Sequence, residues 1–563
     1  MGISFSNPVG DDKQAEIKEL IEAVLKTFTL QYTKAYGIEL LKKIKADVQA
    51  EPPSWQLLER PSGSFKKPLK TGYLTKQGAV RKSWLRRFFV VRADYKIEYY
   101  EDEEIYNKGG KPKGTISPCG YTVSRDLDKD LLSRAQEIAE KMGIDASDIP
   151  AIPKYPNFAF EIHHHRRRCY FIHAEKEEEK DEWVKVFKQC CRHCYGFNNP
   201  DPVAQAAFRQ AIRRTRWELG RWGYWTYGGS EEQVLSDLIV DELNWTVMKD
   251  VYYNIKGPYA IRMTIRNKVL QTLDTFVSAA VTPAYKAMET AVKALRGRVE
   301  GMIREKIEPI FGAEKEIKEK IKNAVVETVS PVLSERVSPR LAGIVQILTS
   351  PMSEAFQETR NLFDEKVAHL ARKVKDNNGF GDKMEHYFHD LDNAPQIIYV
   401  MSDAYKKVDV MHDPLWALRQ FFDEIEPWSL IWTAHDLLKR VLDNAMYTFE
   451  KELQDEGEQT NLKTDSGAAE AAILKVKESV QERFAHDASD ATTEYYKDIM
   501  LSIVKPFLLK IVNPLTKPLL EPINNAVPDA FKEIIDVEEM FESVVEGIVG
   551  DSISKVIEHV TSS

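Results

Sequence analysis

Three adjoining segments decide the fold of the first third of this chain: Thr71-Gly-Tyr-Leu-Thr-Lys-Gln-Gly78, Ala79-Val-Arg-Lys-Ser83 and Trp84-Leu-Arg-Arg-Phe-Phe-Val-Val91. The two outer segments are rich in the aromatic and β-branched residues that favour strands, and the middle segment has the composition of a short turn. The sequence therefore predicts a hairpin with a basic turn.

The charge of this hairpin differs from that of the whole protein. Between Pro61 and Ala93 there are nine basic side chains and no acidic one, although the 563-residue chain has a net charge of -9. The nine are Lys66, Lys67, Lys70, Lys76, Arg81, Lys82, Arg86, Arg87 and Arg92. The hairpin is thus a local cationic patch on an acidic protein.

Further strands and a helix follow the hairpin. Strands are expected at 96–102, 114–118, 158–162 and 169–174, and apolar residues recur at helical spacing after Glu175. This arrangement resembles a pleckstrin-homology (PH) domain, in which the basic loop is the usual phosphoinositide site and a Trp in the last helix plugs the barrel. We expect Trp183 to be that core residue, and the PH-like unit to span 63–197 with a charged, surface-exposed helical insert at 126–156.

The resemblance to phosphoinositide-binding PH domains implies a set of lipid-binding residues. Lys76 and Arg87 stand where such domains place headgroup ligands, but Leu85 replaces the basic residue expected two positions before Arg87. The candidate lipid-binding residues are Lys76, Arg81, Lys82, Arg86 and Arg87. Lys82 can compensate for Leu85, whereas Arg86 should point to the other face because strand side chains alternate. We expect attraction to anionic phospholipid or phosphoinositide; the alternative is a PH fold that docks proteins and binds no lipid.

The beginning of the chain offers a second membrane signal. Met1-Gly-Ile-Ser-Phe-Ser6 fits the pattern for N-myristoylation at Gly2. One acyl chain binds membranes only marginally, so a basic surface would complete the anchor. No run of about 18 uninterrupted apolar residues predicts a membrane span. Five cysteines, an odd number clustered near one helix, indicate a reducing compartment.

Most of the remaining sequence has a helical pattern. Residues 11–50 are expected to form one or two amphipathic helices. From residue 198 onward, helical stripes are interrupted near Pro309, Pro331, Pro339 and Pro351, and further helices are expected at 468–484, 494–512 and 537–560. The fold class is therefore α+β and multidomain: a helical segment at 1–60, the PH-like β-barrel with its capping helix, and a long all-α bundle at 198–563. The polar face of the 537–560 stripe is mainly Glu and Asp, which favours core or partner packing over a membrane-lying helix.

Other clusters do not predict catalysis or metal binding. The cluster of Cys190, Cys191, His193 and Cys194 has no second Cys/His pair at zinc-site spacing, so packing is its favoured role. The spacing of a zinc protease is also missing at His386 and His389. No metal or cofactor is therefore expected. The run His163–Arg168 indicates a strand–strand turn, read as a solvated tip or as an extension of the cationic surface. Phosphate-loop, dinucleotide, nucleophile-elbow and kinase patterns are missing, which favours a protein that is not an enzyme. A pI near 5.9 argues against nucleic-acid binding.

The order of these parts, together with four stretches, resembles the Niban family. The stretches are Tyr99–Lys113, Gly223–Leu243, Asp443–Glu450 and Val537–Glu558. The resemblance covers nearly the whole chain and implies a cytoplasmic, membrane-associated regulator of stress responses, cell survival or signalling without enzymatic activity. The long acidic tail of vertebrate members is not found in this sequence.

The sequence thus predicts a non-enzymatic adaptor. It would sit peripherally at the inner face of the plasma membrane through the PH domain and bind proteins through its helical region. The alternatives are a membrane-shaping or cytoskeletal helical scaffold, which would expose a concave, Lys/Arg-rich dimer surface, and an enzyme of unfamiliar type.

Overall fold

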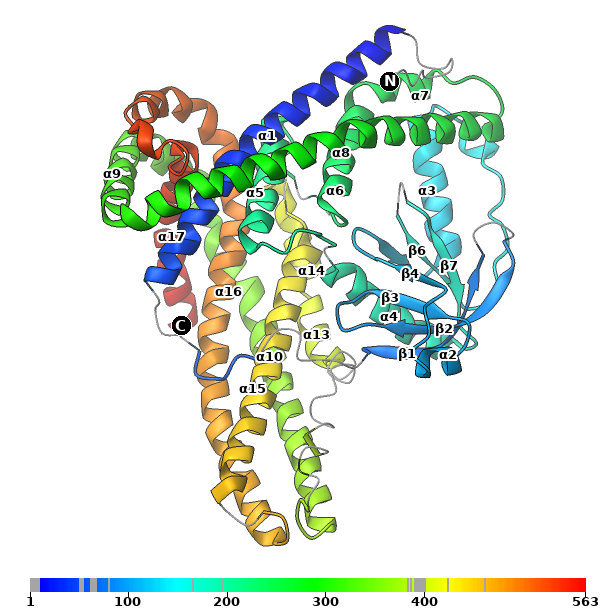
Figure 1. Ribbon diagram of the computed structural model, residues 1–563, viewed down its shortest axis with the longest axis vertical. Helices are drawn as coiled ribbons and strands as arrows, with labels where there is room; N and C mark the ends of the chain where they lie inside the picture. The colour runs from blue at the N-terminus through cyan, green and yellow to red at the C-terminus, as the bar shows by residue number, and fades with distance from the viewer. Residues whose placement is uncertain are drawn as a thin grey trace. The chain divides into compact units, whose positions relative to one another are not determined.

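The computed structural model describes residues 11–49, 55–60, 68–78, 82–164, 167–194, 196–223, 225, 227–381, 384, 387–388, 401–422, 425–459 and 462–562 (Figure 1). The chain folds into two compact units. The first contains residues 1–46, 66–221 and 225–306, and the second contains residues 47–65, 222–224 and 307–563.

A seven-stranded antiparallel sheet forms the centre of the first unit. Its spatial order is β4-β3-β2-β1-β7-β6-β5. The strands are β1 Lys70–Gln77, β2 Trp84–Val91, β3 Ile97–Tyr100, β4 Gly114–Ile116, β5 Thr122–Ser124, β6 Ala159–His163 and β7 Tyr170–His173. The hairpin β1–β2 is the one expected from the sequence, and the sheet is PH-like.

The helix α4, Glu177–His193, packs on this sheet and supplies the expected aromatic plug. Trp183 is 1% exposed and meets the rings of Phe89 and Phe187. Gly72 on β1 makes this possible, since a Cβ there would lie 3.1 Å from the Trp183 indole. The prediction that Trp183 is a core residue is confirmed.

The other helices of the first unit include the insert and a long aromatic seam. They are α1 Asp11–Val48, α2 Glu103–Asn107, α3 Leu127–Lys141, α5 Pro202–Glu218, α6 Glu231–Thr246, α7 Met248–Tyr253 and α8 Tyr259–Glu305, with a 3-10 turn at Ala146–Asp148. Phe28 and Tyr32 of α1 pack against Phe208 of α5, and Tyr285 of α8 joins them. The sequence placed a boundary near residue 198, whereas α5 to α8 belong to the same compact unit as the sheet. The three-part division stays a prediction about which parts fold independently.

The second unit is helical in its described residues. It contains α9 Ile307–Val332, a π-helical turn Leu333–Val337, α10 Ser338–Asp376, α13 Ser402–Asp409, α14 His412–Ala417, α15 Pro427–Gln459, α16 Ser466–Asn525 and α17 Val537–Ser562, with 3-10 turns at Leu418–Gln420 and Asp529–Phe531. The helix α16 packs against α9, α10, α15 and α17. Phe541 and Val545 of α17 are 3% and 0% exposed, so the stripe of α17 is a core stripe.

Several prolines do not end helices as the sequence suggested. Pro351 lies inside α10. The helix α16 continues through the expected gap at 485–493 and then through Pro506, Pro514, Pro518 and Pro522. A proline inside a helix costs about 3 kcal/mol because it removes a backbone hydrogen bond and crowds the preceding turn. Burial of side chains such as Leu509, Val512 and Leu520 along α16 offsets this cost.

The same helix is long and apolar enough to cross a membrane when judged by length and composition alone. Its most apolar 18-residue window has a mean hydropathy of 1.4, and 44% of that window is buried inside the protein. A core helix passes the same test, and the packing of α16 against four other helices accounts for its apolar residues.

Candidate functional site

Three cations, from β1, β2 and the segment just before β7, lie close together at one end of the barrel. In the β1–β2 register, Leu74 pairs with Arg87, so Arg87 shares the interior face of the barrel with Leu74 and with Lys76 two positions further on. Lys76 also pairs with Ile172 of β7. Arg168 lies just before β7 and faces the same site, where its charge acts on Lys76. We call Lys76, Arg87 and Arg168 the mouth cluster.

Lys76 is the most constrained member of the mouth cluster. It is 6% exposed, and its Nζ lies 4.5 Å from the centre of the Tyr99 ring. Burial, then repulsion from Arg168 and Arg87, lowers the pKa of Lys76 to about 8. An anion bound here would relieve this repulsion and raise the pKa again.

The two arginines remain available to a ligand. Arg87 Nη1 donates to its neighbour's backbone oxygen, Arg86 O, at 2.8 Å. The exposed Arg168 guanidinium lies 4.8 Å from the centre of the Tyr170 ring. Within the described part of the chain, no carboxylate forms an ion pair with Lys76, Arg87 or Arg168. Three cations without a carboxylate partner, beside two tyrosine rings, suit a phosphate group.

The remaining candidate residues lie elsewhere. Arg86 points to the other face of β2, as strand alternation predicts: its guanidinium lies 3.9 Å from the centre of the Tyr73 ring, and its Nε lies 3.9 Å from Glu175 Oε1. Lys82 is exposed in the β1–β2 turn with φ 53°. Arg81 and Gly2 lie outside the described residues.

Sequence reasoning considered the run His163–Arg168 as an extension of the cationic surface but did not name Arg168 among the lipid-binding residues. Leu85 lies opposite Lys76 and is 39% exposed, at the position where a lipid-binding PH domain would have a basic residue. Arg168 supplies a third cation near Lys76 instead. The available signal was topology: the last strand of the barrel pairs with β1, so basic residues just before that strand reach the end of β1.

The expectation of a solvated tip at His163–Arg168 is wrong for His164 and Arg167, whereas Arg168 is exposed. His164 is 3% exposed and packs against the Tyr121 ring. Arg167 donates to Cys119 O and Gly228 O and forms an ion pair with Asp237 Oδ2 at 3.1 Å. The physical reason is that α6 and the segment before it cover this turn. The carbonyl oxygen of Gly228 and the carboxylate of Asp237 in these elements accept hydrogen bonds from the Arg167 guanidinium.

The cysteine-rich end of α4 is a packing site, as expected. Cys190 and Cys194 are 0% and 7% exposed. Cys194 Sγ lies 3.8 Å from Cys119 Sγ, which in turn lies 2.9 Å from Ser117 Oγ. All five cysteines are free thiols. His386 and His389 lie outside the described residues.

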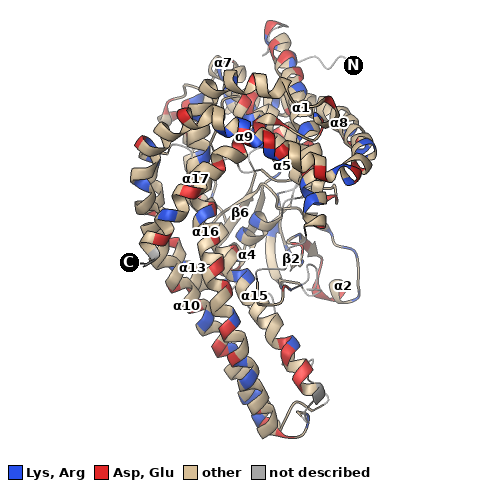
Figure 2. Ribbon diagram, turned by 90° about the vertical axis from the view of Figure 1, so that its left-hand side faces the viewer, with Lys and Arg blue, Asp and Glu red and all other residues tan. Residues whose placement is uncertain are grey.

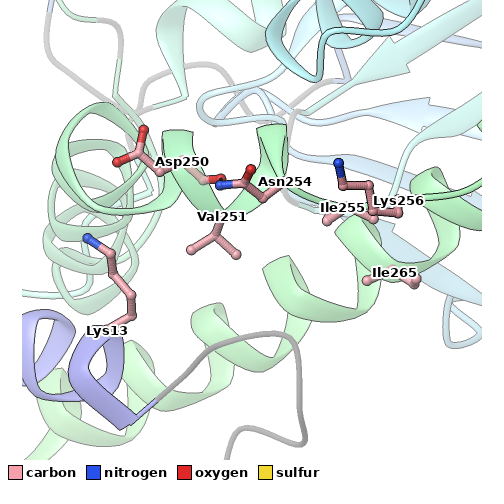
Figure 3. A pocket seen from close by; sticks show the side chains of 7 residues that line it. All are labelled: Lys13, Asp250, Val251, Asn254, Ile255, Lys256 and Ile265. Atoms are coloured by element: carbon pink, nitrogen blue, oxygen red, sulfur yellow. The ribbon is translucent and has the colours of Figure 1, made fainter.

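A hollow of about 370 Å³ lies between the start of α1 and the helices α7 and α8 (Figure 3). Its described lining is Lys13, Asp250, Val251, Asn254, Ile255, Lys256 and Ile265. These side chains include no His, Cys or Ser and no pair of carboxylates, so they do not form an arrangement for acid–base or nucleophilic catalysis.

The sheet, its capping helix and the cationic mouth define a PH-domain protein with a long helical region. Residues 72–196 match the family model "Protein Niban 2-like, PH domain", and residues 331–506 match "Protein Niban 2-like domain". Neither description names a catalytic domain.

Relatives match along the whole chain. A PH domain-containing protein of Dictyostelium discoideum is 35% identical over 96% of this chain and 98% of its own length. Human Niban 2 is 25% identical over 97% of this chain and 72% of its own length, and human Niban 1 is 26% identical over 99% and 60%. The crystal structure of human FAM129B/MINERVA/NIBAN2 superposes with a TM-score of 0.84 at 24% identity, covering 99% of each chain. This chain belongs to the Niban family.

Proposed function

We propose that this chain is a non-enzymatic adaptor that associates peripherally with anionic membranes through the mouth of its PH barrel. The mouth cluster, with Lys82 and Arg81 of the adjoining turn, would contact phosphate groups of phospholipid or phosphoinositide at the cytoplasmic face of the plasma membrane. The helical region would bind protein partners, and family membership supports a role in stress response, cell survival or signalling.

The observation that carries the proposal is the unpaired charge at the barrel mouth. Lys76 keeps an ammonium group under the Tyr99 ring although burial and two guanidinium groups oppose it. A fold does not gain stability from three clustered cations, so a bound anion is the natural source of compensation. Each basic group near an anionic surface contributes about 1 kcal/mol.

The test uses two adjacent arginines on opposite faces of one strand. Arg87→Glu reverses a charge in the mouth cluster, whereas Arg86→Glu makes the same change on the face that carries Tyr73. In co-sedimentation with vesicles of phosphatidylcholine and phosphatidylglycerol, Arg87→Glu should weaken binding about tenfold or more, and more than Arg86→Glu. It should also flatten the dependence of binding on salt.

A second arm identifies the ligand. Adding a few per cent of a phosphoinositide to the vesicles should strengthen wild-type binding and not that of Arg87→Glu. Equal loss in the two variants would indicate attraction to the whole patch rather than a site at the mouth. Unchanged binding in both would place the PH domain among those that dock proteins.

The alternative of a membrane-shaping or cytoskeletal scaffold requires a helical surface rich in Lys and Arg. In the view of Figure 2, basic and acidic residues alternate along the long helices α10, α15 and α16. Mixed charge of this kind favours protein contacts over a membrane-bending face.

A further inference from the structure

Three side chains of different chemistry converge on the outer face of the barrel, away from the mouth cluster. Glu161 and His163 lie two apart on β6 and therefore point to the same side of the sheet. Ile162 pairs with Tyr170, and continuing that register places Cys169 opposite His163. One donor atom from each residue lies within 4.8 Å of the other two.

The distances between these atoms match the edges of a tetrahedral ligand set. Bonds of about 2.0 Å from zinc to nitrogen or oxygen and about 2.3 Å to sulfur separate N and S by about 3.5 Å and N and O by about 3.3 Å. His163 Nδ1 lies 3.2 Å from Cys169 Sγ and 3.5 Å from Glu161 Oε1. Two of the three edges therefore have about the length expected around one ion, and the third, from Cys169 to Glu161, is at most 4.8 Å.

The surroundings of Glu161 resemble those of a metal-binding carboxylate. Glu161 is 1% exposed, and its other oxygen, Oε2, accepts a bond from Arg134 of α3, which lies alongside β6 (Figure 1). Burial by itself would raise the pKa of Glu161, but bonds from His163 and Arg134 outweigh it and lower the pKa. The carboxylate is thus ionised and held by one oxygen, as outer partners hold ligands in metal sites, while Oε1 faces His163.

From this geometry we propose that Glu161, His163 and Cys169 bind a divalent transition-metal ion of the zinc type, with water as the fourth ligand. One oxygen, one nitrogen and one sulfur donor form a ligand set that suits zinc. Magnesium and calcium prefer sets made of oxygen ligands, so this site should not select them. The His163 side chain is 23% exposed, which gives the ion a path to the site. The thiol of Cys169 releases its proton when the ion binds.

The bound ion has a structural consequence for the turn between β6 and β7. Cys169 follows Arg168 directly, so an ion that holds Cys169 to β6 also fixes the end of the turn that carries Arg168. The site is separate from the mouth cluster, and metal binding does not depend on the proposed lipid binding.

The test is cobalt titration of the full chain after removal of metal with a chelator. Wild-type protein should bind one equivalent of Co²⁺ with a thiolate-to-metal absorption band in the near ultraviolet, and Zn²⁺ should displace it. Cys169→Ser should abolish the band, whereas Cys119→Ser should retain it. The latter is the matched control because Cys119 and Cys194 are the other close pair of thiols.

A second measurement needs no variant. Zn²⁺ should protect Cys169 from alkylation in the wild-type chain, as mapped by mass spectrometry, while His163→Gln should remove that protection. Absence of the band and of protection in the wild type would overturn the proposal. A band that survives Cys169→Ser and is lost in Cys119→Ser would also overturn it, because the metal would then lie at the other thiol pair.

Discussion

The lowered pKa of Lys76 predicts that anionic-vesicle binding depends on pH in a range where most lysines do not titrate. With a pKa of about 8, Lys76 is about 90% protonated at pH 7 and about 9% protonated at pH 9. Because a bound anion favours the charged amine, affinity should be highest below pH 8 and fall as the pH rises through 8. The expected loss between pH 7 and pH 9 is about tenfold, or about 1.4 kcal/mol.

The assay is binding to vesicles containing phosphatidylglycerol, whose phosphodiester keeps its charge over this range. The other cations facing Lys76 are the guanidinium groups of Arg87 and Arg168. Burial raises the pKa of Tyr170, so its phenol does not become an anion in this window. Lys76→Arg is the control, because a guanidinium at this position cannot lose its proton below pH 9.

Two results would refute this reasoning. A flat wild-type profile from pH 7 to pH 9 would mean that Lys76 does not contact the anion or keeps its proton throughout. The same tenfold loss in Lys76→Arg would assign the titration to another group.

Three further predictions concern stability and anchoring. Phe541→Ala should lower the free energy of unfolding of the second unit by about 3–5 kcal/mol, measured by thermal or chemical denaturation. The control Lys555→Ala, at an exposed position of the same helix, should change this free energy by less than about 0.5 kcal/mol. An unaltered unfolding midpoint for Phe541→Ala would argue that the stripe of α17 docks a partner instead. Trp183→Ala should cost about 3–5 kcal/mol in the PH domain, and retention of full stability would contradict its role as the barrel plug. Gly2→Ala should shift the protein from membrane to soluble fractions of eukaryotic cells, most strongly together with Arg87→Glu, because two weak attachments to one surface reinforce each other; an intact mass showing unmodified Gly2 would remove the acyl anchor.

The sequence by itself determined the features that depend on local pattern. The aromatic and β-branched residues of segments 71–78 and 84–91 specified the hairpin, and strand alternation correctly separated Arg86 from Arg87. The stripes of apolar residues at helical spacing specified the helices, and the resemblance to PH domains identified Trp183 as the barrel plug. The stripes and the separation of Arg86 from Arg87 follow from side-chain periodicities of 3.6 and 2 residues, and the hairpin follows from strand propensity.

Only the tertiary structure decided the features that depend on residues far apart in sequence. Pairing of β1 with β7 brought Arg168 beside Lys76, 92 positions away, and the resulting repulsion and burial lowered the pKa of Lys76. Packing against neighbouring helices allowed α16 to run through four prolines that local rules treat as breaks. The hydrogen bonds of Arg167 and the convergence of Glu161, His163 and Cys169 likewise arise from neighbours across the sheet or on α6. Burial and charge–charge interactions depend on distances between groups in three dimensions. The separation of two residues along the chain does not give that distance until the barrel and the bundle are folded.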